Sequence, residues 1–239
     1  MTLNSAIEGL DKVIRSETRK GSVILITGEP GTLKTVLTFS LMNGMLKDEK
    51  DKVGVYVTLE ETREDHLWNM KSFGIAPVDN LKIYDIGKFK SNMKLHDRYS
   101  IISKDFMEMT MRAVYMGEKI PEGDDKQLEK PLCYALDSLN ALLTLSKVDI
   151  AQRREFIQEL FFYLKEQKVT CFIIWEDNED YKDPFFLADG VIELGFIPKQ
   201  NGEPDRYLKI RKLKGVKHYL GRFIIEIGKN GIEIISKKV

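Results

Sequence analysis

The chain has 239 residues, of which 43% are hydrophobic and 31% are charged, and this balance excludes a chain that is disordered throughout. Lysine plus arginine and aspartate plus glutamate both total 37, so no overall positive field would attract nucleic acid or an anionic membrane. The length fits one large domain, and we expect residues 1–239 to form it.

The apolar segments indicate where the chain resides. The amino-terminal stretch has no apolar run of signal-peptide type, and the longest apolar runs are too short to cross a bilayer. Cys133 and Cys171 each lie inside an apolar run, so we expect buried small side chains rather than a disulfide or a metal pair. These features predict a cytoplasmic protein without membrane contact.

Short β-branched strands alternate with amphipathic helices through the first three quarters of the chain, an order typical of a parallel sheet covered on both faces. The predicted strands lie at 21–28, 52–60, 80–87, 131–138 and 169–177. The predicted helices lie at 34–47, 62–73, 95–116 and 150–167, with a charged surface loop at 117–130.

From Gly190 onward the predicted strands are separated by turns and not by helices. They lie at 190–197, 206–214, 222–228 and 231–236. Strands joined in this way pair antiparallel. The sequence therefore predicts an α/β fold in which helices flank a mostly parallel central sheet with an antiparallel C-terminal β extension.

A phosphate-binding loop is predicted at residues 28–35, "GEPGTLKT", between the first strand and the first helix. In such loops backbone N–H groups converge on phosphates at a helix N-terminus, a lysine reaches the outer phosphates and a threonine hydroxyl binds Mg²⁺. Gly28, Gly31, Lys34 and Thr35 fit these positions. The alternative is a chance Gly/Pro turn near a lysine, and the flanking strand and helix favour the phosphate loop.

Acidic residues end two of the predicted strands, where parallel strands deliver side chains to a ligand. Asp137 is suited to hold magnesium through its water shell. Glu60 and Glu61 would repel each other unless a cation or water network needs them, so one is a candidate general base. Alternatively, Asp137 marks a strand-to-turn junction, and Glu61 with Asp65 only favours a helix dipole.

At these residues the chain resembles the KaiC-like ATPases of the RecA superfamily, which include many single-domain archaeal members. The resemblance is carried by "GLDKVI", "KGSVILITGEPGTLKT", "YVTLEET", "ALDSL", "LADGVIEL" and "LKIRKLKGVKH", in that order. It extends from about Ser5 to the C-terminus and is weakest across 88–130. It implies a RecA-like P-loop fold that binds ATP or ADP and hydrolyses ATP with Mg²⁺.

The resemblance also implies roles for individual residues. Nucleotide contacts fall on Gly31, Thr32, Leu33, Lys34 and Thr35, and the flanking Gly28, Pro30 and Val36 complete the predicted segment. Magnesium falls on Thr35 and Asp137, and the catalytic residues are Glu60, Glu61 and Lys34. In ring-forming members the stretch that matches Lys212, Leu213, Lys214 and His218 reaches the nucleotide of the neighbouring subunit. A homo-oligomer, with a hexamer as one form, or a nucleotide-dependent protein partner is therefore expected.

Three departures from the family pattern bear on activity. Leu33 occupies the last glycine position of the loop, where a side chain must point away from phosphates. Lys214 stands at the position of an arginine finger and lacks the planar guanidinium. "RSETRK" replaces a glycine-rich segment before the first strand. We expect ATP binding to survive and hydrolysis to be slow.

Two other functions remain open. A recombinase-paralogue accessory that binds single-stranded DNA is favoured by the basic segment 206–222, although the zero net charge and the lack of clustered aromatic residues oppose it. A non-hydrolysing, ATP-gated scaffold is favoured by Leu33 and Lys214. The basic segment has a structural alternative as well, an exposed edge strand kept soluble by its lysines.

Several other residues are expected to be structural. His66 and His96 have no ligand-like spacing to cysteine or to another histidine, which argues against a metal site. Trp175 is expected to pack at the end of its strand. For Glu176 and Asp177, which follow it, a solvated turn is favoured over contact with the outer phosphate. Residues 185–190 are expected to pack and then turn.

Overall fold

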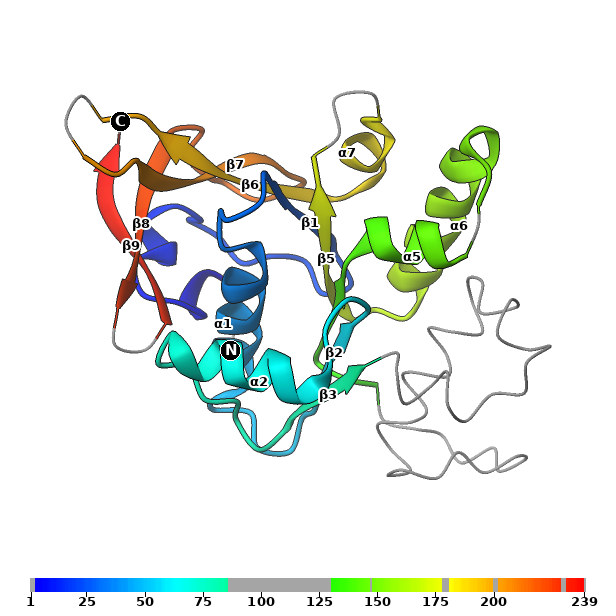
Figure 1. The fold of residues 1–239 in the computed structure, drawn as a ribbon, viewed down its shortest axis with the longest axis horizontal. Coiled ribbons are helices and arrows are strands. Elements are labelled where there is room, and N and C mark those ends of the chain that lie inside the picture. The colour runs from blue at the N-terminus through cyan, green and yellow to red at the C-terminus, as the bar shows by residue number, and fades with distance from the viewer. Residues whose placement is uncertain are drawn as a thin grey trace.

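A computed structural model describes residues 3–85, 130–146, 148–177, 181–199, 202–228 and 231–238. These residues form a nine-stranded sheet in the order β3-β2-β4-β5-β1-β6-β7-β8-β9 (Figure 1). The strands up to β6 pair parallel with their neighbours, and β6 through β9 pair antiparallel. The predicted α/β fold with an antiparallel C-terminal extension is confirmed.

The strands lie close to their predicted positions. They are β1 (Val23–Gly28), β2 (Gly54–Thr58), β3 (Leu81–Asp85), β4 (Cys133–Asp137), β5 (Thr170–Glu176), β6 (Gly190–Ile197), β7 (Asp205–Leu213), β8 (Arg222–Gly228) and β9 (Gly231–Lys238). Every residue of β1 and β2 is buried, because helices cover both faces of the sheet there. The two cysteines lie on the adjacent strands β4 and β5 and are free and buried, as expected.

The helices are α1 (Lys34–Leu46), α2 (Arg63–Ser72), α5 (Leu139–Leu145), α6 (Arg153–Glu166) and α7 (Asp183–Leu187). Short 3-10 turns occupy Leu3–Ser5, Leu10–Lys12 and Ile150–Gln152. The predicted capping box of α2 is present, because the Thr62 hydroxyl accepts the backbone N–H of Asp65 at 3.1 Å. Among the residues that the structure describes, no helix combines the length and apolar character needed to cross a bilayer.

Two hydrophobic cores lie on opposite faces of the sheet, one against α1 and α2 and the other against α5 and α6 (Figure 1). Alternate residues of β1 divide between them, with Ile24 and Ile26 on the α1 face and Val23 and Leu25 on the α6 face. The amino-terminal 3-10 turns also pack on the α1 face, which β9 closes on its far side.

Three local features differ from the predictions or lie outside the described residues. The basic strand β7 lies between β6 and β8, so the alternative of an exposed edge strand is wrong. The short helices α5 and α7 were not predicted, because five to seven residues give no readable helical period. The helix expected at 95–116, with His96, and nearly all of the loop at 117–130 lie outside the described residues.

Candidate nucleotide-binding site

The loop between β1 and α1 has a backbone that requires glycine at two positions. Gly28 has φ 148° and Gly31 has φ 81°, both in the region that side chains disfavour. A Cβ at Gly28 would also collide with the Leu194 carbonyl of β6. The loop is held closed by the Thr32 hydroxyl, which donates to the Glu29 carbonyl at 2.7 Å. This is the compact turn that a phosphate loop needs.

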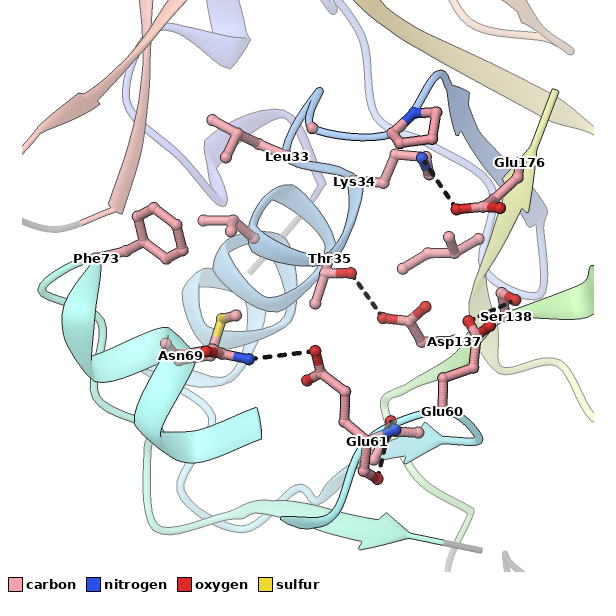
Figure 2. Close-up of a pocket in the computed structure, with 16 residues that line it drawn as sticks. Leu33, Lys34, Thr35, Glu60, Glu61, Asn69, Phe73, Asp137, Ser138 and Glu176 are labelled. Atoms are coloured by element: carbon pink, nitrogen blue, oxygen red, sulfur yellow. Dashed lines mark hydrogen bonds and ion pairs between the residues drawn. The ribbon is translucent and has the colours of Figure 1, made fainter. Parts of the chain in front are cut away.

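Leu33 adopts the glycine-like conformation that its position demands, with φ 72° and ψ 31°. A left-handed leucine costs about 1–2 kcal/mol, because its Cβ crowds the following carbonyl. Its partly buried side chain packs against the core on the α1 face, and in Figure 2 it points away from Lys34 and Asp137. The backbone at Leu33 therefore has the conformation that a glycine would adopt there. The side chain points outward, as the sequence predicted.

Lys34, the first residue of α1, turns back over the loop. Its ammonium donates to the carbonyls of Gly28 at 2.9 Å and Glu29 at 3.1 Å and lies 3.8 Å from a carboxylate oxygen of Glu176. The side chain is 8% exposed, and this burial lowers the pKa of Lys34 despite the acids around it. A buried ammonium satisfied mainly by carbonyls is well placed to take a phosphate oxygen.

Asp137, the last residue of β4, faces the N-terminus of α1 (Figure 2). Its Oδ2 accepts hydrogen bonds from the Thr35 hydroxyl and the Tyr56 hydroxyl, both at 2.8 Å. Burial raises the pKa of Asp137 to about 6 although both hydrogen bonds oppose that change. Among the residues that the structure describes, the partners of this carboxylate are two hydroxyls and no cation, so its charge is only partly compensated.

Glu60 and Glu61 follow β2, which pairs with β4 so that Thr58 lies opposite Asp137. Glu60 accepts a hydrogen bond from the Ser138 hydroxyl at 3.1 Å. Glu61 accepts one from the Asn69 amide of α2 at 3.2 Å (Figure 2). The two acids are thus held by different elements and their carboxylates point in different directions.

His66 on α2 is enclosed beside Glu61. Its ring is completely buried against Phe39 and Tyr56, with centroid distances of 5.4 Å and 4.6 Å. Nδ1 lies 3.4 Å from a carboxylate oxygen of Glu61, and neither ring nitrogen has a hydrogen-bond partner among the described residues. Burial lowers the pKa of His66, so the ring is neutral at pH 7. It is a packing residue, as expected, that also contacts the acidic cluster.

The phosphate loop, Glu60, Glu61, Asp137 and Glu176 line one pocket of about 330 Å³. Its lining residues are Pro30, Gly31, Leu33, Lys34, Thr35, Val36, Thr58, Glu60, Glu61, Asn69, Met70, Phe73, Asp137, Ser138, Ile174 and Glu176. In Figure 2 the labelled acids other than Glu61 lie toward the β5 side, while Leu33 and Phe73 lie at the opposite end. The pocket therefore has a charged end and an apolar end.

The segment 212–218 lies away from this pocket in its own chain. The Lys212 ammonium donates to the carbonyls of Phe185, Phe186 and Ala188 at the end of α7, at 3.2, 3.1 and 2.6 Å. Lys214 lies 3.2 Å from Asp189, and Leu213 is buried. His218 forms an antiparallel bridge with Ile14 near the amino terminus.

Sequence reasoning missed several residues of the site. Glu176 was expected in a solvated turn, but it ends β5 and lines the pocket. Its position after a buried strand, the same signal that identified Asp137, could have found it. Arg206 of β7 donates to the Gly31 carbonyl at 3.1 Å, and Tyr56 holds Asp137 from the strand interior. No sequence pattern links these two residues to the loop.

Comparisons with known proteins agree with this geometry. A family model described as "ATPase: KaiC" matches residues 3–239. The chain is 28% identical over 244 residues to the circadian clock oscillator protein KaiC of Parasynechococcus marenigrum (strain WH8102), covering 97% of this chain and 44% of the relative. It is 27% identical over 243 residues to the protein of that name from Synechococcus elongatus, with the same coverage. The chain thus spans less than half the length of the curated relatives it matches.

A solved structure is similar over its whole length. The crystal structure of a KaiC-like protein from the hyperthermophilic archaeon Pyrococcus horikoshii OT3 superposes with a TM-score of 0.73 at 25% identity. The match covers 98% of this chain and 99% of that chain. The resemblance inferred from the sequence and its RecA-like fold are thereby confirmed. The chain belongs to the KaiC family of P-loop ATPases.

Proposed function

We propose that the chain binds ATP with Mg²⁺ in this pocket and hydrolyses it slowly, and that the bound nucleotide governs assembly with further copies or with a protein partner. One observation carries the proposal. The Thr35 hydroxyl meets the Asp137 carboxylate at 2.8 Å beside the loop that presents Lys34. These residues are 102 positions apart in the chain, and only the order of the strands brings them together.

The donor set suits magnesium. A hydroxyl and a carboxylate at the edge of a phosphate loop are hard oxygen ligands, and the raised pKa of Asp137 indicates a charge that a cation would satisfy. Thr35 and Asp137 would hold the ion, and Tyr56 would orient the carboxylate. When bound, Mg²⁺ supplies positive charge that neutralises phosphate oxygens.

The polar and apolar ends of the pocket match the two ends of a nucleotide. The loop backbone and Lys34 would hold the phosphates, since they present donors at the N-terminus of α1. Met70 and Phe73 of the α2 region, with Leu33, form an apolar wall that would suit the base and sugar.

Glu60 is the proposed general base. Ser138, which follows β4 and caps α5, donates to the Glu60 carboxylate, and both Glu60 and Asp137 line the charged end of the pocket. A water between Glu60 and the outer phosphate would be polarised for in-line attack, while Lys34 neutralises charge on the phosphate. The Asn69 amide of α2 holds the Glu61 carboxylate, which would help to order the attacking water.

Slow turnover follows from the state of the segment 212–218. In the proposed homo-oligomer Lys212, Lys214 and His218 would contact the nucleotide of the neighbouring copy. Lys212 would first have to leave three carbonyls, and Lys214 would have to leave Asp189. Lys214 is also a point charge without the two-pronged geometry of arginine.

A nucleotide-gated scaffold is the second candidate, favoured by this engagement of both lysines within their own chain. Single-turnover measurements separate the two functions. Bound ATP that releases no phosphate over hours indicates the scaffold, and phosphate release indicates the ATPase.

The test of the proposed function uses two variants with matched controls. Lys34→Ala should abolish binding of Mg-ATP in calorimetry, whereas Lys47→Ala, at an exposed lysine just after α1, should bind normally. Glu60→Gln should bind Mg-ATP and lose turnover. The control Glu64→Gln, at an exposed glutamate on α2, should keep both binding and turnover. Turnover by Glu60→Gln at the wild-type rate would show that the general base is another residue.

A further inference from the structure

Glu176 is the last residue of β5 and lies directly opposite Gly28, the last residue of β1. The parallel register therefore fixes its position at the start of the phosphate loop. Its carboxylate lies 3.8 Å from the Lys34 ammonium (Figure 2). The exposed fractions of the two side chains are 52% and 8%, so the carboxylate approaches the buried ammonium from the open side of the pocket.

A reciprocal pair of hydrogen bonds fixes the backbone of Glu176. The Asn140 amide of α5 donates to the Glu176 carbonyl at 3.3 Å, and the Glu176 N–H donates to the Asn140 side-chain oxygen at 2.8 Å. The side chain of Glu176 is thus anchored at its base. Within the described part of the chain, Lys34 is the one cation that its carboxylate contacts.

Within the described part of the chain, the other two acids of the charged end are held by neutral hydroxyl groups and not by a cation. Asp137 accepts hydrogen bonds from Thr35 and Tyr56, and Glu60 accepts one from Ser138. Glu176 alone among these three acids forms an ion pair with the lysine that would bind the outermost phosphate. A terminal phosphate and the Glu176 carboxylate therefore compete for one ammonium. When either of them pairs with Lys34, the other stays close to it as an unpaired negative charge, and the two anions repel each other.

We propose that Glu176 makes the site discriminate against the third phosphate, so that a nucleoside diphosphate binds better relative to a triphosphate than the loop alone would allow. This inference rests on the proposed function, because it assumes that nucleotide phosphates occupy the loop. A diphosphate would be held mainly by the backbone N–H groups of the loop, with Lys34 at its outer phosphate. A triphosphate would bring a further charged group to the Lys34 ammonium, where Glu176 already lies, and would therefore disturb the Lys34–Glu176 pair more.

Calorimetry with ADP and with a non-hydrolysable ATP analogue, each with Mg²⁺, tests this on the intact chain. Glu176→Gln removes the charge and keeps the size of the side chain. The substitution should tighten binding of the triphosphate analogue about tenfold, which is the effect expected on removal of a half-exposed charge. It should change the affinity for ADP less than about threefold. Asp177→Asn is the matched control, because Asp177 is the next residue and pairs with Lys182 at 2.6 Å outside the pocket. It should leave both affinities within about twofold.

The outcomes separate the two proposals. Equal effects of Glu176→Gln on both nucleotides, or an equal shift with Asp177→Asn, would overturn the role of Glu176 while leaving the nucleotide site intact. No binding heat from either nucleotide, in wild type and variant alike, would overturn the proposed function and this inference together.

Discussion

The carboxylate of Asp137 imposes a cost on the folded protein, and the variant Asp137→Asn should reveal it. Burial raises the pKa of this group from 3.8 to about 6, so the folded chain binds the proton more tightly than the unfolded chain does. The contribution of this group to the free energy of unfolding is therefore complete at low pH and is lost as the pH rises through about 6. The shift corresponds to about 3 kcal/mol at neutral pH, of which water in the open pocket screens a part.

Asparagine keeps the shape of the side chain and offers an oxygen to the Thr35 and Tyr56 hydroxyls, but it carries no charge. We expect the free energy of unfolding of Asp137→Asn to exceed that of wild type by about 1–3 kcal/mol near pH 7.5, and by about half as much near pH 5. Urea denaturation at the two pH values, without nucleotide or divalent cation, measures this difference.

A second measurement on the same samples links the cost to the proposed cation. Mg-ATP should raise the thermal midpoint of wild type and raise that of Asp137→Asn much less, because the variant lacks a magnesium ligand. A variant less stable than wild type near pH 7.5, or a stability difference that grows as the pH falls, would refute the electrostatic argument.

Two further substitutions test single features of the site. Leu33→Gly relieves a left-handed leucine but adds chain entropy and removes partly buried apolar surface, so the free energy of unfolding should change by less than about 1 kcal/mol. Because the backbone is already glycine-like, Mg-ATP affinity in calorimetry should change less than about threefold, and a tenfold change would show that the side chain controls the loop. His66→Leu removes two buried nitrogens that lack hydrogen-bond partners among the described residues and should stabilise the chain by about 1 kcal/mol in urea denaturation. Burial lowers the pKa of His66, so below about pH 6.5 the unfolded chain binds the proton more readily than the folded chain does. Wild type should therefore lose stability as the pH falls below that value, and the variant should lose less. A variant destabilised at neutral pH would instead indicate that the ring bonds to Glu61.

The sequence was sufficient for features that depend on neighbouring residues. Buried strands such as Val23–Gly28 appear as unbroken apolar runs, and the Thr62 cap and the loop glycines follow local backbone rules. The pairing of Thr35 with Asp137 could also be anticipated, because parallel strands deliver their last residues to one edge of a sheet.

Features that depend on strand order could not be read in the same way. That Glu176 faces Lys34 follows from β5 lying next to β1, although 147 residues separate the starts of these strands in the chain (170 minus 23). The interior position of β7, and hence the intrachain carbonyl partners of Lys212, likewise requires the tertiary arrangement. A strand rich in lysine has the composition of an edge strand, and only its neighbours show otherwise.

The strand β7 has a mechanical consequence for the loop. Near its start Arg206 donates a hydrogen bond to the Gly31 carbonyl, and near its end Lys212 donates to the carbonyls at the end of α7. At 3.3 Å per residue these two contacts lie about 20 Å apart along the strand. β6 pairs with β7 from Asp205 to Leu213, with a register shift between Ile210 and Lys212, and β8 pairs with the first half of the strand, from Arg206 to Lys209. Under the proposed assembly, a neighbouring copy that displaces Lys212 from these carbonyls would therefore act on the same strand that contacts this chain's own phosphate loop through Arg206.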